Sequence, residues 1–132
     1  DGYRYEPLWI NPADAAELGI GHGDIVRVYN ERGWTLGGAY VSERVMRHAV
    51  LQDHGARIDP IVVGESDRGG TNNLIAPKAV ASKNCAGEVT SGYLVGVEKV
   101  DVFELAARYP EAFGRPYDPD YGVLQDAWFD LD

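Results

Sequence analysis

The sequence is poor in the residues on which several classes of protein depend. It has one cysteine, so neither an internal disulfide nor a metal site built from several cysteines can form within it. Its 12 lysine and arginine residues against 21 aspartates and glutamates argue against nucleic acid, since phosphate neutralisation needs clustered bases. No apolar run approaches the roughly 20 residues that a membrane span requires. We therefore expect neither a nucleic-acid nor a membrane partner.

Local motifs for phosphates, metals and nucleophiles are also missing. There is no GxxxxGK[ST] loop, and no GxGxxG follows a predicted strand. The histidines His22, His48 and His54 have no His or Cys partner at metal-ligand spacing. Cys85 has no histidine near it in sequence that could act as its base. We expect this chain to contribute no catalytic residue and no metal ligand.

The charge is unevenly distributed along the chain. Residues 1–100 carry 13 acidic and 10 basic side chains, whereas residues 101–132 carry 8 and 2. The length suits one domain, so we divide it into a body (1–100) and an acidic, aromatic tail (101–132) of the same domain. No initiator Met and no signal peptide are visible, and we expect a piece of a longer, cytoplasmic polypeptide.

Short strands dominate the first half of the body. A strand over 8–10 leads into a helix that Asn11 caps and Gly19 ends. A strand over 25–29 is followed by a hairpin turn in which Gly33 is free to take a positive φ. The return strand runs to residue 41, with a bulge or sharp bend expected at its paired glycines, Gly37 and Gly38.

The second half is less regular. After a strand over 49–52, glycines and prolines interrupt residues 53–84, which predicts a long functional loop anchored by apolar side chains. A strand over 93–97 and a helix capped by Asp101 and stopped by Pro110 complete the pattern. Many short strands with one small helix near the start favour a mainly β fold of barrel type.

A glycine- and asparagine-rich stretch within the long loop is the best candidate binding site. Paired glycines let a backbone approach a ligand closely, amide side chains can read the edge of a purine or pterin, and an arginine can meet a phosphate. A second donor-rich group follows shortly afterwards. A plain structural turn remains the alternative interpretation of the first stretch. The candidate residues are Arg68, Gly69, Gly70, Asn72 and Asn73, then Ser82, Lys83 and Asn84.

The order of the motifs resembles a known domain. It is similar to the C-terminal domain of the dimethyl-sulfoxide-reductase family of enzymes. The motifs that carry the resemblance are NPADA at 11–15, LGI at 18–20, GDIVRV at 23–28 and the Asn-Leu pair at 73–74. Within that family, the segments at 54–57, 67–70, 82–87, 90–92 and 97–100 are similar to the large subunit of pyrogallol–phloroglucinol transhydroxylases. The resemblance covers about residues 8–100; the tail carries no motif of the family.

The resemblance implies a double-psi β-barrel that binds molybdopterin guanine dinucleotide, with molybdenum or tungsten held mainly by the pterin. It also implies that catalytic residues lie in other domains of the parent chain, and that an iron–sulfur subunit is a partner. The parent would be an oxidoreductase or transhydroxylase acting on hydroxylated aromatics. The alternative is a stand-alone barrel that binds a protein. We expect the aromatic residues of the tail to contact the rest of the parent, namely Phe103, Tyr109, Phe113, Trp128 and Phe129.

Overall fold

Short strands make up most of the regular secondary structure in the computed structural model, which describes residues 1–88 and 91–117. The strands are β1 (Pro7–Ile10), β2 (Ile25–Asn30), β3 (Gly33–Val41), β4 (Val50–Gln52), β5 (Pro60–Val62), β6 (Ser66–Asp67), β7 (Val80–Ser82), β8 (Cys85–Glu88) and β9 (Gly96–Lys99). The helices are α1 (Pro12–Glu17), the 3-10 helix η1 (Asn72–Leu74), α2 (Val102–Arg108) and α3 (Pro110–Phe113). The prediction of a mainly β fold with short helices is confirmed.

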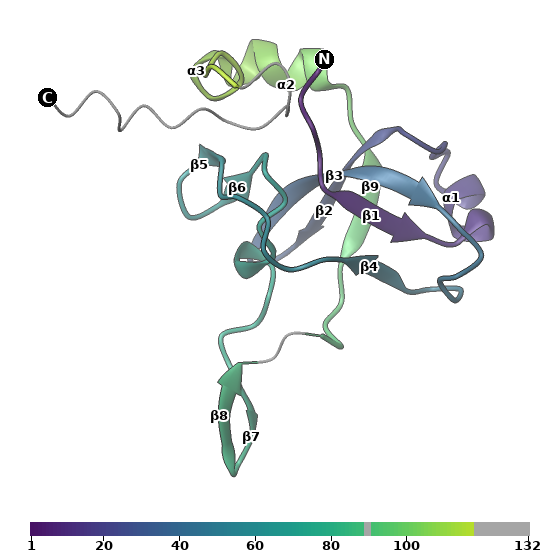
Figure 1. Cartoon of the computed structure of the whole chain (residues 1–132), viewed down its shortest axis with the longest axis vertical. Coiled ribbons are helices and arrows are strands. Elements are labelled where there is room, and N and C mark those ends of the chain that lie inside the picture. The colour runs from purple at the N-terminus through teal and green to yellow at the C-terminus, as the bar shows by residue number, and fades with distance from the viewer. Residues whose placement is uncertain (89–90, 118–132) are drawn as a thin grey trace, which may run out of the picture.

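Seven of these strands form one mixed sheet, and β7 and β8 form a separate hairpin that projects away from it (Figure 1). Along the sheet, β4, β1, β3, β2 and β9 are neighbours in that order. The long strand β3 pairs parallel with β1 and β6 and antiparallel with β2. Parallel neighbours cannot be joined by a tight turn, so the chain between them must cross over. The crossover from β1 to β3 contains α1 and β2.

Alternation along β1 and β2 builds the core. Leu8 and Ile10 are each 1% exposed, Val26 is 0% and Val28 2%, and the residues between them are less buried. This is the period-two pattern of strands that turn one face inward. Ile75, from the segment after η1, joins the same cluster.

The first helix forms as its sequence predicts. The Asn11 side chain accepts a hydrogen bond from the backbone N–H of Ala13 at 2.9 Å, Pro12 takes the first helical position, and Gly19 follows with φ +68°. Asn11 also donates to the carbonyl of Val45 at 2.9 Å. The cap therefore joins the helix start to the segment that leads into β4.

Two glycine predictions are wrong. Gly33 does not have a positive φ; it is glycine because a Cβ there would lie 2.5 Å from the Glu65 carbonyl oxygen. Gly37 and Gly38 do not form a bulge, since the pairing of β3 with β2 continues through them without a register shift. At Gly37 a Cβ would lie 3.1 Å from the Glu6 carbonyl oxygen. In both places the glycine allows a close approach between strands.

The segment 53–84 is more ordered than a long loop. It contains β5, β6, η1 and β7, and β6 pairs with β3 at the centre of the sheet. Strands of two or three residues carry too little hydrophobic periodicity to be recognised in sequence. Of the apolar side chains expected to anchor this segment, Ile75 is 2% exposed and does so, whereas Ile58 at 61% and Val63 at 87% are exposed and do not.

The C-terminal part confirms the predicted helix and adds another. The carboxylate of Asp101 accepts from the N–H of Phe103 at 2.8 Å and caps α2. Pro110 ends α2 as expected but also begins α3, for which its fixed φ is suited. Trp128 and Phe129 lie outside the described residues.

Leu8→Ala tests whether β1 carries the core. Leu8 is fully buried in a strand paired on both sides, so we expect the free energy of unfolding to fall by roughly 2–5 kcal/mol. Urea unfolding followed by far-UV circular dichroism measures it. Leu94→Ala is the matched control, since Leu94 is 90% exposed. Equal losses in the two variants would contradict this account of the core.

Candidate functional site

A cavity of about 950 Å³ lies between β4 and the segment 91–97. Leu8, Ile10, Val28 and Ile75 from the core contribute apolar lining. Polar and charged lining comes from α1 and from the segments on either side of β4, namely Asp14, Glu17, His48, Gln52, Asp53 and His54, together with Asn72. An apolar hollow of this size with a few polar groups is typical of a small-molecule or cofactor site.

The glycine pair of the candidate loop is separated from β6 only by Arg68 and is tightly packed. A Cβ on Gly69 would lie 2.0 Å from the Arg57 carbonyl oxygen, and one on Gly70 would lie 2.8 Å from Cβ of Glu6. Gly70 also has φ +96°, which other residues rarely adopt. Contacts within the chain therefore already require glycine at both positions.

Beside this loop, four buried polar atoms have no hydrogen-bond partner among the described residues. They are both amide atoms of the Gln52 side chain, Oγ1 of Thr71 and Oδ1 of Asn72. An unpaired buried donor or acceptor costs about 1–3 kcal/mol, so such groups are rare without a reason. Gln52 and Asn72 also line the cavity, so two of the three residues that carry these atoms lie at its wall.

The two asparagines of the loop lie differently. The amide of Asn72 donates to the backbone carbonyls of Gln52 at 3.4 Å and Asp53 at 3.1 Å, so it ties the loop to the end of β4. Its Oδ1 is left as the free acceptor. Asn73 is exposed and so is available to a molecule outside the chain.

The second predicted group lies elsewhere. Ser82, Lys83 and Asn84 are exposed at the turn of the β7–β8 hairpin, which extends from the sheet toward the bottom of Figure 1. The structure therefore presents the two groups as separate surfaces. A ligand that contacts both groups would have to be extended.

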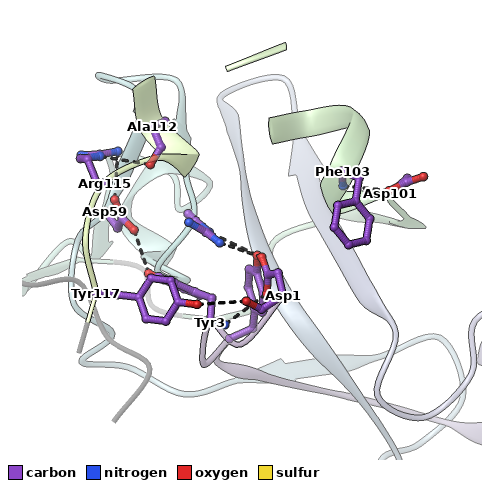
Figure 2. Close-up of polar contacts among 10 residues, drawn as sticks. Asp1, Tyr3, Asp59, Asp101, Phe103, Ala112, Arg115 and Tyr117 are labelled. Atoms are coloured by element: carbon purple, nitrogen blue, oxygen red, sulfur yellow. Dashed lines mark hydrogen bonds and ion pairs between the residues drawn. The ribbon is translucent and has the colours of Figure 1, made fainter. Parts of the chain in front are cut away.

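Arg68 is the least accessible of the predicted residues. Its side chain is 4% exposed, its guanidinium lies 2.7 Å from the Asp1 carboxylate, and the Tyr3 ring stacks against it with 4.0 Å between guanidinium carbon and ring centre. Asp1 and Tyr3, two of these partners, are labelled among the polar contacts that Figure 2 draws. A phosphate could reach this guanidinium only if protein partners moved away.

Asp14 is an acidic residue in the cavity lining, and its carboxylate accepts hydrogen bonds from the segment that leads into β4. Its carboxylate accepts from the backbone N–H of His48 at 2.6 Å and from Arg47 at 2.7 Å. The N–H of His48 lowers the pKa of Asp14 most, followed by the Arg47 guanidinium. His48 itself has φ +62°, so this hydrogen bond stabilises a backbone conformation that non-glycine residues seldom adopt.

The described residues contain no cluster of three or more histidine, cysteine or acidic side chains able to hold a metal ion. His22 has a structural contact, since its Nδ1 accepts from the N–H of Val41 at 3.1 Å. No helix in the described ranges is both long and apolar enough to span a bilayer.

Sequence reasoning missed Gln52 and Asp14 as parts of the site. Gln52 pairs with Leu8 across β4 and β1, so its side chain lies on the inner face. Alternation along 49–52 could have placed it there, but nothing in sequence marks its amide as unpaired. In sequence, Asp14 is an ordinary acidic residue in the first turn of a helix. Its hydrogen-bond partners are 33 and 34 residues away, so local sequence does not indicate them.

Comparison with known proteins identifies the family that this chain matches. The family model described as "Molydopterin dinucleotide binding domain" matches residues 1–90. That range includes the strands β1 to β8 and the whole loop from Arg68 to Asn73, whereas β9 and the cavity wall over 91–97 lie beyond it.

Several curated proteins are similar over most of the chain. A trimethylamine-N-oxide reductase of Haemophilus influenzae is 38% identical over 98 residues, which is 71% of this chain and 12% of that protein. A dimethyl sulfoxide/trimethylamine N-oxide reductase of Cereibacter sphaeroides is 41% identical over 72% of the chain and 12% of its own length. The pyrogallol hydroxytransferase large subunit of Pelobacter acidigallici is 36% identical over 76% and 12%. The chain thus spans about an eighth of these relatives.

Asp14→Asn tests the hydrogen-bonded carboxylate at the cavity rim. A lowered pKa in the folded state stabilises the protein above the ordinary aspartate value of about 3.9, and this stabilisation is lost as pH falls toward the lowered pKa. We expect the variant to be less stable at pH 7 but to lose less stability on acidification, as measured by urea unfolding from pH 7 to 3. Glu43→Gln, in the exposed turn after β3, is the control. Parallel pH profiles for wild type and Asp14→Asn would refute the role.

Proposed function

This chain belongs to the family of molybdopterin dinucleotide binding domains, and on that basis we propose that it is the cofactor-binding domain of a larger oxidoreductase that uses bis(molybdopterin guanine dinucleotide) with molybdenum or tungsten. The observation that carries the proposal is that the glycine loop and the unpaired polar atoms, which all lie within the matched range, meet beside the cavity. The family match favours this function over a stand-alone barrel that binds a protein.

The residues beside the loop fit such a group chemically. The amino-lactam edge shared by pterin and guanine has N–H donors next to a carbonyl acceptor. The Gln52 amide has a donor and an acceptor, Thr71 Oγ1 can serve as either, and Asn72 Oδ1 is an acceptor, all buried and unpaired. A ligand that paired with them would remove the cost of leaving them unsatisfied.

We assign the binding surface to the loop and to the β7–β8 turn. Gly69 and Gly70 belong to this surface through their place in the loop, although their close contacts are with Arg57 and Glu6 of this chain. Asn72 and Asn73 provide amide contacts, with Asn73 the most accessible. Arg68 belongs to the surface through its place in the loop. The remaining contacts are assigned to Ser82, Lys83 and Asn84, which are exposed and donor-rich.

For the fold we propose a double-psi β-barrel over residues 1–100, with 101–132 as the tail of the same domain. The parallel pairing of β3 with both β1 and β6, within an otherwise antiparallel sheet, supports this topology. Such pairing requires two crossing connections that bring distant segments to one central strand.

The metal, when bound through the pterin, supplies the redox chemistry. This chain's residues orient the cofactor and exclude water from it, and we assign them no catalytic step. Metal-site and substrate residues, and an iron–sulfur partner subunit, are proposed to lie outside the chain. We propose a transhydroxylase-like reaction on hydroxylated aromatics, for which the similarity to the pyrogallol hydroxytransferase large subunit is the support.

Asn73→Ala in the full-length protein tests the assignment of the loop. Losing one ligand hydrogen bond, worth about 0.5–1.5 kcal/mol, should raise the rate of cofactor loss roughly three- to tenfold with little change in thermal unfolding. Guanine nucleotide and metal retained after gel filtration are the measurements. Glu43→Ala, exposed and outside the cavity lining, is the control. Normal retention in Asn73→Ala would remove this residue from the site.

Analysis of metal and nucleotide content in the full-length protein, made in a host that synthesises the pterin dinucleotide, tests the function itself. We expect roughly one molybdenum or tungsten and about two guanine nucleotides per chain. A folded protein with neither would refute the proposal. Turnover should then be assayed with hydroxylated aromatics and with N- and S-oxides in parallel, since relatives of both kinds exist.

A further inference from the structure

The C-terminal segment 110–117 lies outside the matched range and packs against the part of the chain that precedes the glycine loop. Helix α3 contacts β5, and Figure 1 shows α2 and α3 on the same side of the sheet as the N-terminal segment. Ala112 is 7% exposed, so this face of α3 is covered. The contacts of the segment converge on two residues, Arg68 and Asp59.

The first set of contacts holds the Arg68 side chain between two rings. The guanidinium carbon lies 4.0 Å from the centre of the Tyr3 ring and 4.4 Å from that of Phe113 in α3. Asp1 accepts from it at 2.7 Å and the Tyr5 hydroxyl at 3.2 Å. A buried cation needs such partners, because leaving it unpaired away from water is very unfavourable. Phe113 is therefore one of the two aromatic rings nearest to the guanidinium.

The second set of contacts runs through Asp59, as Figure 2 shows. Its carboxylate is 1% exposed; it pairs with Arg115 at 2.9 Å and accepts from the Tyr3 hydroxyl at 2.9 Å. Arg115 also donates to the carbonyls of Ala112 and Pro60. Tyr117 donates from its hydroxyl to the backbone carbonyl of Asp1 at 3.0 Å. The segment is thus fastened to both the N-terminal residues and the strand β5.

Both sets of contacts continue into the candidate loop. The backbone N–H of Arg68 donates to the Asp59 carbonyl at 2.8 Å, and that of Asp59 to the Asp67 carboxylate at 2.7 Å. The other oxygen of Asp67 accepts from the N–H of Thr71 at 3.2 Å. Displacing Arg68 or Asp59 must therefore displace the backbone on both sides of Gly69, which has no spare room beside Arg57.

We propose that residues 110–117 act as a clasp that positions the loop 69–73, with Arg68 as the positioning residue and Phe113 as the contact that holds it. The effect on the cofactor rests on the proposed function of the loop, whereas the coupling of the clasp to the loop does not. Arg68 thereby acts through the backbone it fixes, and not by presenting its charge to a ligand.

Phe113→Leu in the full-length protein is the first test, with Phe103→Leu as the matched control, since Phe103 is 77% exposed on α2. We expect amide hydrogen exchange in residues 69–76 to become about tenfold faster, while exchange in the β2–β3 ladder changes by less than about twofold. Phe113→Tyr, which keeps the ring, should restore slow exchange. An unchanged loop, or equally faster exchange throughout the sheet, would overturn the clasp.

Arg68→Lys is the second variant, because it keeps the charge but loses the planar group that stacks between two rings. It should loosen the loop as Phe113→Leu does and should release guanine nucleotide faster. If Asn73→Ala loses nucleotide but the two clasp variants retain it with a loosened loop, the positioning role is wrong and the proposed function stands. If the clasp variants loosen the loop and no variant, Asn73→Ala included, loses nucleotide, the clasp stands and the assignment of the loop to the cofactor is wrong.

Discussion

The hydrogen bonding of β3 to three strands is the constraint on which the cavity depends. β4 is attached to the sheet through β1, and β9 through β2, while the glycine loop follows directly after β6. β1, β2 and β6 all pair with β3. The walls of the cavity are therefore placed relative to one another by a single nine-residue strand. Gly33 and Gly37 keep that strand close to Glu65 and Glu6, which a side chain would push away.

Polar groups around the glycine loop are satisfied on one side and unsatisfied on the other. On the side of the clasp, Asp67 is 0% exposed and its two oxygens accept from Asp59 and Thr71. On the side of the cavity, the Gln52 amide and Asn72 Oδ1 have no partner within the described chain. A loop held firmly on one face and left with unpaired groups on the other is suited to binding, because little ordering is needed when the ligand arrives.

The part of the chain that matches the family and the C-terminal segment 110–117 are different parts of the molecule that contact each other. The matched range includes the glycine loop, β4 and the sheet apart from β9, whereas β9 and the cavity wall over 91–97 lie beyond it. Residues 110–117 lie beyond it, yet they enclose Arg68 and pair with Asp59, which lie inside it. Of the aromatic side chains expected to contact other parts of the parent, Phe113 packs within this chain, whereas Phe103 is exposed.

The sequence by itself determined the features that depend on near neighbours. Asn11 and Asp101 cap their helices through the backbone N–H two residues further on, and the strands over 8–10 and 25–29 follow from their own apolar residues, because these effects act within a few residues. Motif order was enough to indicate the family. Tertiary structure decided why Gly33 and Gly69 are glycine, that Arg68 is enclosed, and that the Gln52 amide lacks a partner. Each of these depends on atoms brought together by the crossing connections around β3, and local periodicity carries no information about such contacts.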